Sequence, residues 1–295
     1  MWERFHALKG GVLVVGHGTR IASGVSQLLD LSHQIQSFVP KIPTQASFLE
    51  LAEPTIPHAM FRLREQNVRL VLVLPILLFE AGHAQSDIPE AVRKAAECEG
   101  ISVLAQSPPL GTADAALALS EFRFSEALRC RNLGGCLTAG GCSQVSECLV
   151  STMNRDRSTN LFDDGDKIGL AMVGRGTSDP IALEHMRRFT ALRVENSKIP
   201  VSWVQTGFFA GGEPKVDQLL KNAASSNCTT IVVQPHLLFE GELIRQLREK
   251  VELYQQNSTN CRWLVTPTLG ADPNLAKAFF TLAEDTLERH FVRKS

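Results

Sequence analysis

The sequence predicts an α/β protein of two tandem lobes, each a small parallel sheet flanked by helices. Short apolar runs alternate with stretches of helical periodicity, an order typical of parallel sheets. The chain also repeats itself. Residues 14–19 (VVGHGT) return as residues 172–177 (MVGRGT), and residues 74–80 (LPILLFE) return as residues 234–240 (QPHLLFE). The offset is about 158 to 160 residues both times, which indicates a duplication in register.

Length and composition suit two ordinary globular domains of roughly 125 residues each. The 295-residue chain is 44% hydrophobic and 21% charged, with a net charge of -1, so bulk attraction to nucleic acid or to an anionic membrane is not expected. The N-terminus shows no signal-peptide pattern, and the longest apolar run, residues 70–79, is too short to span a bilayer. A cytoplasmic protein with mostly reduced cysteines is the expectation.

The elements of the first half follow in order from local patterns. The first strand is a β-branched run that ends at glycine, and the helix after it shows helical spacing from Val25 to Val39 and stops at Pro40. Ser86 and Asp87 before Pro89 predict the start of a later helix. The expected strands are residues 11–15, 46–51, 68–74 and 101–105, and the further expected helices are residues 54–66, 86–97 and 112–128.

The second half repeats this order, with strands expected near residues 168–173, 201–206, 230–234 and 263–266. Asp179 and Pro180 mark the start of its first helix. The stretch between the copies is rich in Gly, Ser, Asn and Asp, which is linker composition. The expected divisions are a lobe at 1–128, a linker at 129–166 and a second lobe at 167–295.

Three residues that can bind a metal ion or accept a proton follow the first three strands of the first lobe. His17 comes directly after the first strand, Glu50 lies at or just past the end of the second, and His83 lies in the loop after the third. Open parallel sheets bind ligands beyond the carboxyl ends of their strands, so these side chains are expected at one rim. Two imidazoles and a carboxylate suit cobalt, nickel or ferrous iron, and they also suit proton acceptance near neutral pH.

The second copy lacks all three groups and keeps the apolar framework around them. The replacements are His17 by Arg175, Glu50 by Ala210, and His83 by Glu242 or Leu243. Independent drift of three surface residues is one explanation. Joint loss of a single site is the simpler one, and it predicts one catalytic lobe and one lobe without the catalytic histidines.

The other histidines are expected to be surface or satisfied core residues: His6, His33, His58, His185, His236 and His290. His17 and His83 differ because neighbouring glycines let the backbone approach closely, as at a binding site. Glu50 taken alone is equally compatible with a solvated charge at a strand end.

These motifs resemble the class II tetrapyrrole chelatases, most closely the sirohydrochlorin cobaltochelatases and ferrochelatases of cobalamin and sirohaem biosynthesis. The segments that carry the resemblance are residues 16–20 (GHGTR), 48–50 (FLE), 75–78 (PILL), 82–83 (GH) and 87–89 (DIP). The likeness covers nearly the whole chain outside the linker. It implies two flavodoxin-like lobes that face each other, here in one fused chain with an active N-terminal lobe.

By this resemblance, His17 and His83 bind the incoming metal and help to remove pyrrole protons, with Glu50 assisting. The metal is a substrate, Co²⁺ or Fe²⁺ with Ni²⁺ as a further candidate, and no organic cofactor is implied. The tetrapyrrole carries many carboxylates, which Arg20 and Arg175 are expected to hold because guanidinium groups match carboxylates. Further candidates for this task are Arg245 and Arg248, for which a solvated helix face is the favoured interpretation.

The predicted function is insertion of Co²⁺ or Fe²⁺ into sirohydrochlorin by a chelatase, a lyase whose partner is the small tetrapyrrole. The fused chain would act as a monomer of two lobes or as a homo-oligomer. A non-catalytic tetrapyrrole or metal carrier is the alternative, although a carrier needs no base. A phosphate-binding protein is a third, because residues 16–19 precede a helix, but the P-loop ending is missing.

Four of the seven cysteines recur every six residues in and near the linker: Cys130, Cys136, Cys142 and Cys148. Four thiols can hold zinc or an iron–sulfur cluster. The usual Cys-x₂-Cys pair is missing from this run. Reduced thiols in a linker are therefore the favoured interpretation.

Overall fold

The computed structural model describes residues 1–79, 82–132, 165–258 and 260–292. The elements of the first half are α1 (Trp2–Ala7), β1 (Gly10–Gly16), α2 (Ala22–Phe38), β2 (Thr44–Phe48), α3 (Ile56–Glu65), β3 (Leu70–Pro75), α4 (Gly82–Glu99), β4 (Ser102–Gln106) and α5 (Asp114–Asn132). Those of the second half are β5 (Ile168–Gly174), α7 (Pro180–Glu195), β6 (Trp203–Phe208), α8 (Val216–Ala224), β7 (Thr230–Pro235), α9 (Glu242–Asn257), β8 (Arg262–Val265) and α10 (Pro273–Val292).

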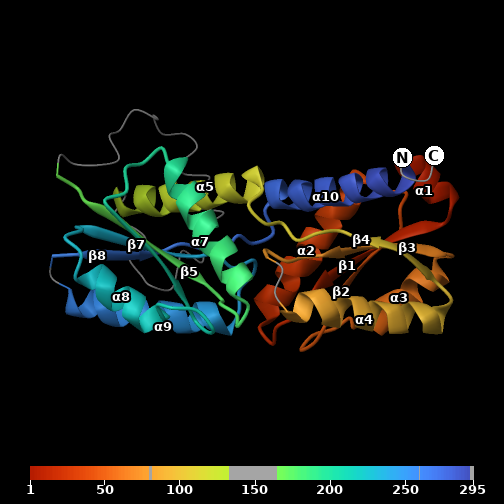
Figure 1. Ribbon diagram of the computed structural model, residues 1–295, viewed down its shortest axis with the longest axis horizontal. Helices are drawn as coiled ribbons and strands as arrows, with labels where there is room; N and C mark the ends of the chain where they lie inside the picture. The colour runs from red at the N-terminus through yellow and green to blue at the C-terminus, as the bar shows by residue number, and fades with distance from the viewer. Residues whose placement is uncertain (80–81, 133–164, 259, 293–295) are drawn as a thin grey trace. The chain divides into compact units, whose positions relative to one another are not determined.

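Each half contributes one parallel four-stranded sheet, and the two sheets have the same strand order. The orders are β2-β1-β3-β4 and β6-β5-β7-β8, and every pairing is parallel. Helices flank both sheets, as Figure 1 shows. The prediction of two tandem α/β lobes of flavodoxin-like order is confirmed. The order reverses between β1 and β3, which is the point where open sheets of this kind bind ligands.

The central strands show why these segments form a sheet. β1 and β5 are buried along their whole length and consist of small and aliphatic residues, as expected of strands covered on both faces. Under α3 and α4, the inward side chains of β1 and β3 pack against Met60, Leu63 and Val92. The helix start predicted at Asp179 is also confirmed, since its carboxylate accepts the backbone N–H of Ile181 at 2.9 Å.

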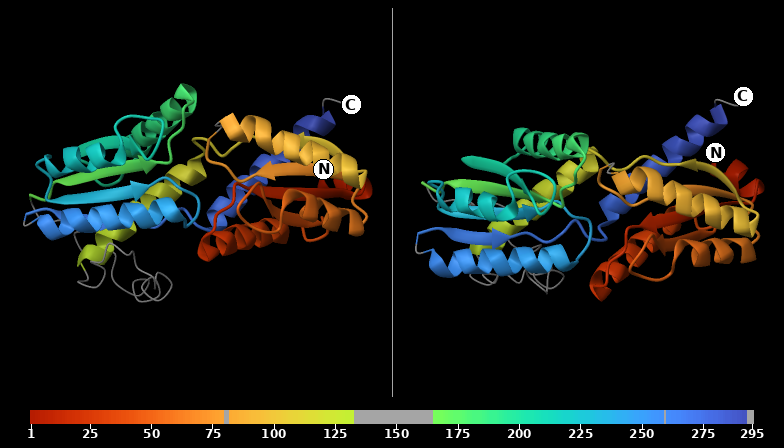
Figure 2. Two further views of the ribbon diagram at one scale, coloured as in Figure 1. Left: turned by 90° about the horizontal axis from the view of Figure 1, so that it is seen from below. Right: turned by 60° about the horizontal axis from the view of Figure 1, so that its bottom comes forward.

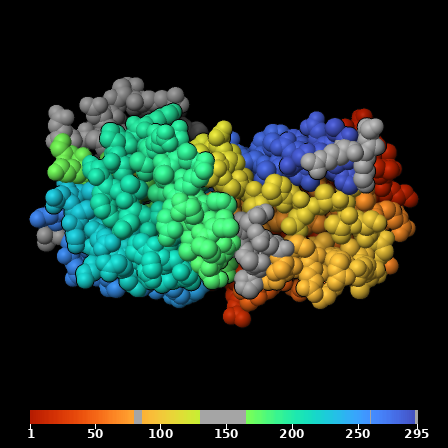
Figure 3. All heavy atoms as spheres, viewed as in Figure 1, coloured from red at the N-terminus to blue at the C-terminus, as the bar shows by residue number. Residues whose placement is uncertain are grey.

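The last helix of each half packs with the sheet of the other half. One compact unit combines residues 1–116 with 238–241 and 270–295, and the other combines residues 117–237 with 242–269. Figures 1 and 2 show α10, in blue, among the red and orange elements of the first unit. In the space-filling view its blue atoms lie directly against yellow atoms of the first half (Figure 3).

Aromatic stacking and hydrogen bonds hold α10 in the first unit. The ring of Phe280 stacks on Trp2 with centroids 5.4 Å apart, and Trp2 Nε1 donates to Glu284 Oε1 at 3.1 Å. Gln34 Nε2, on α2, donates to the carbonyl of Ala271 at 2.9 Å. The boundaries expected along the chain, 1–128, 129–166 and 167–295, follow the repeats. The compact units follow packing between distant segments, which periodicity does not reveal.

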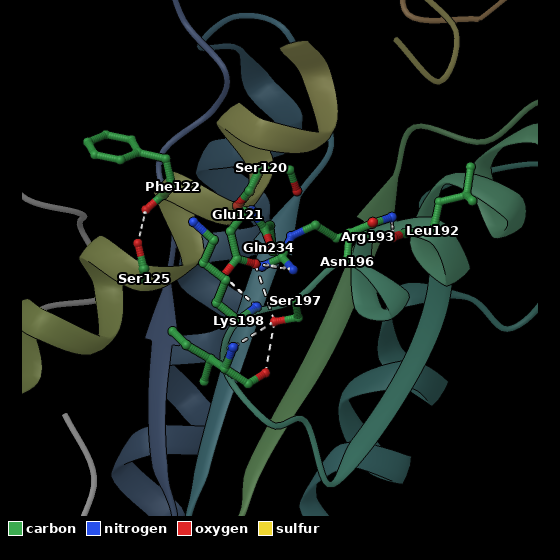
Figure 4. Close-up of polar contacts among 11 residues, drawn as sticks. Ser120, Glu121, Phe122, Ser125, Leu192, Arg193, Asn196, Ser197, Lys198 and Gln234 are labelled. Atoms are coloured by element: carbon green, nitrogen blue, oxygen red, sulfur yellow. Dashed lines mark hydrogen bonds and ion pairs between the residues drawn. The ribbon is translucent and has the colours of Figure 1, made fainter. Parts of the chain in front are cut away.

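A buried polar network holds α5 in the second unit (Figure 4). The Arg193 guanidinium, on α7, is only 1% exposed and forms an ion pair with Glu121 of α5. Burial lowers the pKa of Arg193, and the Glu121 charge opposes that effect. The Glu121 carboxylate also accepts bonds from Ser197 Oγ and from the backbone N–H of Lys198, each at 3.3 Å. One α5 carboxylate thereby satisfies several groups of the second unit.

Two local predictions about helices need correction. The helix expected to start at Ser86 begins four residues earlier, at Gly82, and Pro89 lies inside it. Ser86 Oγ donates to the Asp87 carboxylate at 2.9 Å instead of capping a helix start. The Ser-Asp-x-Pro pattern therefore resembles a cap in sequence without marking the start of this helix. The short helix α1 was not predicted.

The interpretation of the cysteine run lies outside the described residues. α5 includes Cys130, whose side chain is not described, and Cys136, Cys142 and Cys148 lie in the undescribed segment 133–164. Among the described helices, none has the length and apolar character that crossing a membrane requires.

Candidate functional site

Backbone hydrogen bonds beyond the ends of β1 and β2 bring two of the predicted site residues together. The N–H of Leu49 donates to the carbonyl of Gly16 at 2.9 Å, and the N–H of Glu50 donates to the carbonyl of His17 at 3.1 Å. The parallel pairing of the two strands therefore continues into the loops that follow them. As a result, His17 and Glu50 leave the sheet side by side at its carboxyl edge.

This close approach requires a glycine after the histidine. Gly18 has φ of +106°, a value that residues with side chains rarely adopt. A Cβ atom there would lie 1.7 Å from the carbonyl oxygen of Glu50, far inside van der Waals contact. The prediction that glycine serves close backbone approach next to His17 is confirmed for this position.

The side chains of the pair also meet. His17 Nδ1 lies 3.5 Å from Glu50 Oε1, with the imidazole 29% exposed and the carboxylate 54% exposed. A carboxylate beside one ring nitrogen orients the imidazole and favours a proton on that nitrogen. With Nδ1 protonated, Nε2 is the atom that binds a metal ion or accepts a proton.

The structure places the third predicted residue differently from the expectation. His83 was expected in the loop after β3, and its backbone lies instead in the first turn of α4. β3 pairs with β1 on the side opposite β2, so His83 follows the strand next to the one that carries His17. Its side chain is not among those described. Among the side chains that are, no three His, Cys, Asp or Glu residues form a group that could hold a metal ion.

The second lobe reproduces the backbone of this site without its chemistry. The N–H of Phe209 donates to Gly174 at 3.2 Å, and the N–H of Ala210 donates to Arg175 at 3.1 Å. Gly176 has φ of +79°, and a Cβ atom there would lie 1.8 Å from the carbonyl oxygen of Ala210. The structure confirms that Arg175 and Ala210 occupy the positions of His17 and Glu50.

Two residues of the second repeat, Glu242 and Leu243, are candidates for the position that matches His83. α4 begins at Gly82 and α9 begins at Glu242. Counted from the first residue of each helix, Leu243 takes the place of His83. An apolar side chain there can neither bind a metal ion nor accept a proton.

The arginines expected to hold substrate carboxylates are surface residues. Arg20 and Arg175 are both exposed, each close to a strand end of its own lobe. Arg245 forms ion pairs with Glu242 and Glu249 on the exposed face of α9, which supports the favoured interpretation of a solvated helix face. The hydrogen bonds with Glu242 raise the pKa of Arg245 and lower the pKa of Glu242 to about 2.

One part of the first unit comes from the second repeat. Residues 238–241 follow β7 in the second repeat, yet they pack in the unit that contains His17. Their motif (LFEG) suggested only a repeat of residues 78–81. No local pattern indicates on which sheet or helix such a loop packs.

Comparisons with known proteins agree with the fold and identify the family. A family model described as CbiX matches residues 11–127 and 169–286. A sirohydrochlorin cobaltochelatase of Priestia megaterium is 25% identical across 96% of this chain and 81% of its own length. A sirohydrochlorin ferrochelatase of the same organism is 26% identical across 90% of this chain and 86% of its own length.

Solved structures share the fold. SirB from Bacillus subtilis with Fe³⁺ gives a TM-score of 0.69 at 21% identity and covers 94% of both chains. SirB from Bacillus subtilis subspecies spizizenii in complex with cobalt gives a TM-score of 0.67 at 23% identity and covers 95% of both chains. Because the family model matches both repeats and most of the chain, this protein belongs to the CbiX family.

Proposed function

We propose that this protein is a metal chelatase that inserts Co²⁺ or Fe²⁺ into sirohydrochlorin. The observation that carries the proposal is the His17–Glu50 pair, built at the carboxyl edge of one sheet and absent from the same backbone frame of the other. Its relatives named as sirohydrochlorin cobaltochelatases and ferrochelatases support the same reaction. The pathways it would serve are cobalamin and sirohaem biosynthesis.

The reaction requires both a metal ligand and a base. Entry of M²⁺ into the macrocycle releases two protons from pyrrole N–H groups, and these groups are weak acids. An imidazole that binds the metal has its lone pair occupied and cannot accept a proton at the same nitrogen at that moment. The metal must therefore leave the imidazole before the imidazole can act as the base.

His17 and Glu50 are suited to that order of events. As the metal passes from His17 Nε2 to the ring nitrogens, Nε2 regains its lone pair and accepts one pyrrole proton. The imidazolium so formed lies beside the Glu50 carboxylate, 3.5 Å from Nδ1, which stabilises its charge. His83, which follows the neighbouring strand, is proposed as the second metal ligand and proton acceptor.

The remaining groups are assigned to substrate binding and location. Arg20 and Arg175 are proposed to hold carboxylates of the tetrapyrrole, since both are exposed and guanidinium groups bind carboxylates in bidentate fashion. Ni²⁺ is a further candidate metal because imidazole ligands suit it as well. The cytoplasm is the proposed compartment, where thiols are kept reduced.

An absorbance assay tests the proposal directly. Purified protein is mixed with sirohydrochlorin and Co²⁺, Fe²⁺ or Ni²⁺, with Fe²⁺ under anaerobic conditions, and the macrocycle spectrum is followed. The protein should accelerate insertion of at least one of Co²⁺ and Fe²⁺ over the spontaneous rate. His17→Ala and His83→Ala should each lower kcat by about 100-fold, the contribution typical of a positioned base.

A second histidine–glutamate pair provides the control. His58 Nδ1 lies 3.9 Å from Glu53 Oε2 on the surface of the same lobe, and His58→Ala should leave the rate unchanged. No acceleration with any of the three metals would overturn the chelatase proposal. Tight binding of sirohydrochlorin without acceleration would instead identify a tetrapyrrole carrier.

A further inference from the structure

A loop of the second repeat docks on the helix that follows the His17 loop. Residues 238–241 belong to the first compact unit. The backbone N–H of Glu240 donates to Oε1 of Gln27, on the second turn of α2, at 2.8 Å. This hydrogen bond ties the backbone of the loop to a side chain of α2.

A glycine permits the loop to come this close. A Cβ atom on Gly24 would lie 2.1 Å from the carbonyl oxygen of Glu240 and 2.8 Å from Cγ2 of Thr19. Gly24 is helical and needs no unusual φ, so close packing explains the glycine. Thr19 and the carbonyl of Glu240 therefore both lie against Gly24.

The residues that accept this loop occur only in the first repeat. With the offset of 158 that relates Gly16 to Gly174, the position of Gly24 is Ala182 and the position of Gln27 is His185. Ala182 carries the Cβ atom that the contact at Gly24 excludes. The residues on α2 that contact the loop are thus present in the first repeat and replaced in the second, as are the proposed catalytic residues.

The docked loop reaches the His17 loop through Thr19. Thr19 Oγ1 accepts the N–H of Ile21 at 3.2 Å, which fixes the entry into α2. At the other end of the loop, the carbonyl of His17 accepts the N–H of Glu50 at 3.1 Å. Residues 17–21 are therefore held by β2's extension on one side and by α2 with its docked loop on the other.

We propose that Gln27 and Gly24 are positioning residues, which use the docked loop 238–241 of the second repeat to hold the His17 loop in its metal-binding geometry. The inference deepens the proposed chelatase function and rests on it. It also gives the second repeat a role in the reaction although it lacks the catalytic groups. Ordering a loop before the metal arrives removes that entropy cost from binding.

Matched variants test this role. Gln27→Met keeps the size of the side chain and removes the acceptor, whereas Gln27→Glu keeps an acceptor oxygen. Gly24→Ala adds the excluded methyl group, and Ala182→Gly makes the reverse change in the second repeat. Three quantities are measured for the full-length protein: hydrogen exchange of the peptide covering residues 17–23, equilibrium affinity for Co²⁺ alone, and kcat and KM for insertion into sirohydrochlorin.

Gln27→Met and Gly24→Ala should speed exchange of this peptide, weaken Co²⁺ binding about tenfold and lower kcat about tenfold, with KM for the tetrapyrrole nearly constant. Gln27→Glu and Ala182→Gly should behave like the wild type. The inference is wrong if Gln27→Met retains wild-type exchange and Co²⁺ affinity, or if Gln27→Glu fails to rescue either.

The two proposals fail in different ways. A wild-type protein that accelerates no insertion would overturn the chelatase function. The exchange and Co²⁺ binding of the four variants would still decide whether the docked loop positions His17.

Discussion

Nδ1 of His17 lies 3.5 Å from Oε1 of Glu50, although 33 positions separate the two residues in the chain. The contact depends on the register of two parallel strands, because each residue lies just beyond the end of its strand. The equivalent register in the second lobe brings Arg175 beside Ala210. The same backbone therefore supports a histidine–glutamate pair in one lobe and none in the other.

The carboxylate of this pair can be tested without removing its hydrogen-bonding capacity. Glu50→Gln keeps the shape of the side chain and removes the negative charge beside the His17 imidazole. We expect kcat for metal insertion to fall by about 10- to 100-fold while KM for sirohydrochlorin stays nearly constant. Glu53→Gln, beside His58, is the control and should have no effect. Steady-state kinetics would contradict the assignment if both variants retained wild-type kcat.

Gly18 and Gly176 offer a matched pair of substitutions. An added Cβ atom would meet the carbonyl oxygen of the facing strand end at 1.7 Å in the first lobe and 1.8 Å in the second. Gly18→Ala and Gly176→Ala should therefore each lower the free energy of unfolding, by about 1–3 kcal/mol in urea titrations. Co²⁺ affinity should fall in Gly18→Ala alone. Equal loss of Co²⁺ affinity in both variants would argue against a site confined to the first lobe.

Loss of one partner of the Arg193–Glu121 ion pair should destabilise the fold strongly, whereas replacement of both partners by apolar residues should not. Removal of either partner leaves a charge in a largely buried position, so Arg193→Ile and Glu121→Leu should each lower the free energy of unfolding by about 3–5 kcal/mol. The double variant should recover most of that loss. The first repeat supports this expectation, since the position that matches Arg193 is Ile35, which is buried without a charge. Urea unfolding of the three variants as a double-mutant cycle measures the coupling.

His236 should make the fold sensitive to acid. Its imidazole is buried against the ring of Phe189, and burial lowers its pKa from 6.5 to about 3. Between these two pH values the unfolded chain binds one proton more than the folded chain at this residue. The contribution of His236 to the free energy of unfolding is therefore fully present above about pH 6.5. It decreases by about 1.4 kcal/mol per pH unit as the pH falls toward 3.

The first repeat suggests the variant that removes this effect. Ile76 stands where the second repeat has His236, and both side chains are buried. His236→Ile should reduce the slope of unfolding free energy against pH by up to one proton between pH 4 and pH 6. A slope identical to that of the wild type would show that the acid sensitivity lies elsewhere. His58→Ala, on the surface, serves as the control.

Much of the fold was predictable because its signals are local. Strand β1 could be recognised from its short β-branched run, and the start of α7 from Asp179 and Pro180, whose carboxylate and fixed φ act within one helical turn. The start of α4 was missed because Ser86 and Asp87 imitate a cap. In the structure that helix begins at Gly82, and Pro89 lies in its interior.

The part of the site that lies at the ends of strands could be predicted from the sequence. His17 and Glu50 could be assigned to one rim because parallel strands end at the same edge, and the repeat shows that the second copy has neither group. The distance between their side chains depends on the register of β1 against β2. The sequence pattern does not determine that register to within one residue.

The linear sequence thus determined the duplication, the α/β class of each lobe and the asymmetry between His17 and Arg175. Hydrophobic periodicity is a local signal, and the two repeats can be aligned residue by residue. The three-dimensional packing alone decided that α10 joins α2, that α5 binds Arg193 through Glu121, and that residues 238–241 pack beside the His17 loop. Each of these choices follows from complementarity between surfaces that lie more than 70 positions apart, and no local pattern encodes the partner of such a surface.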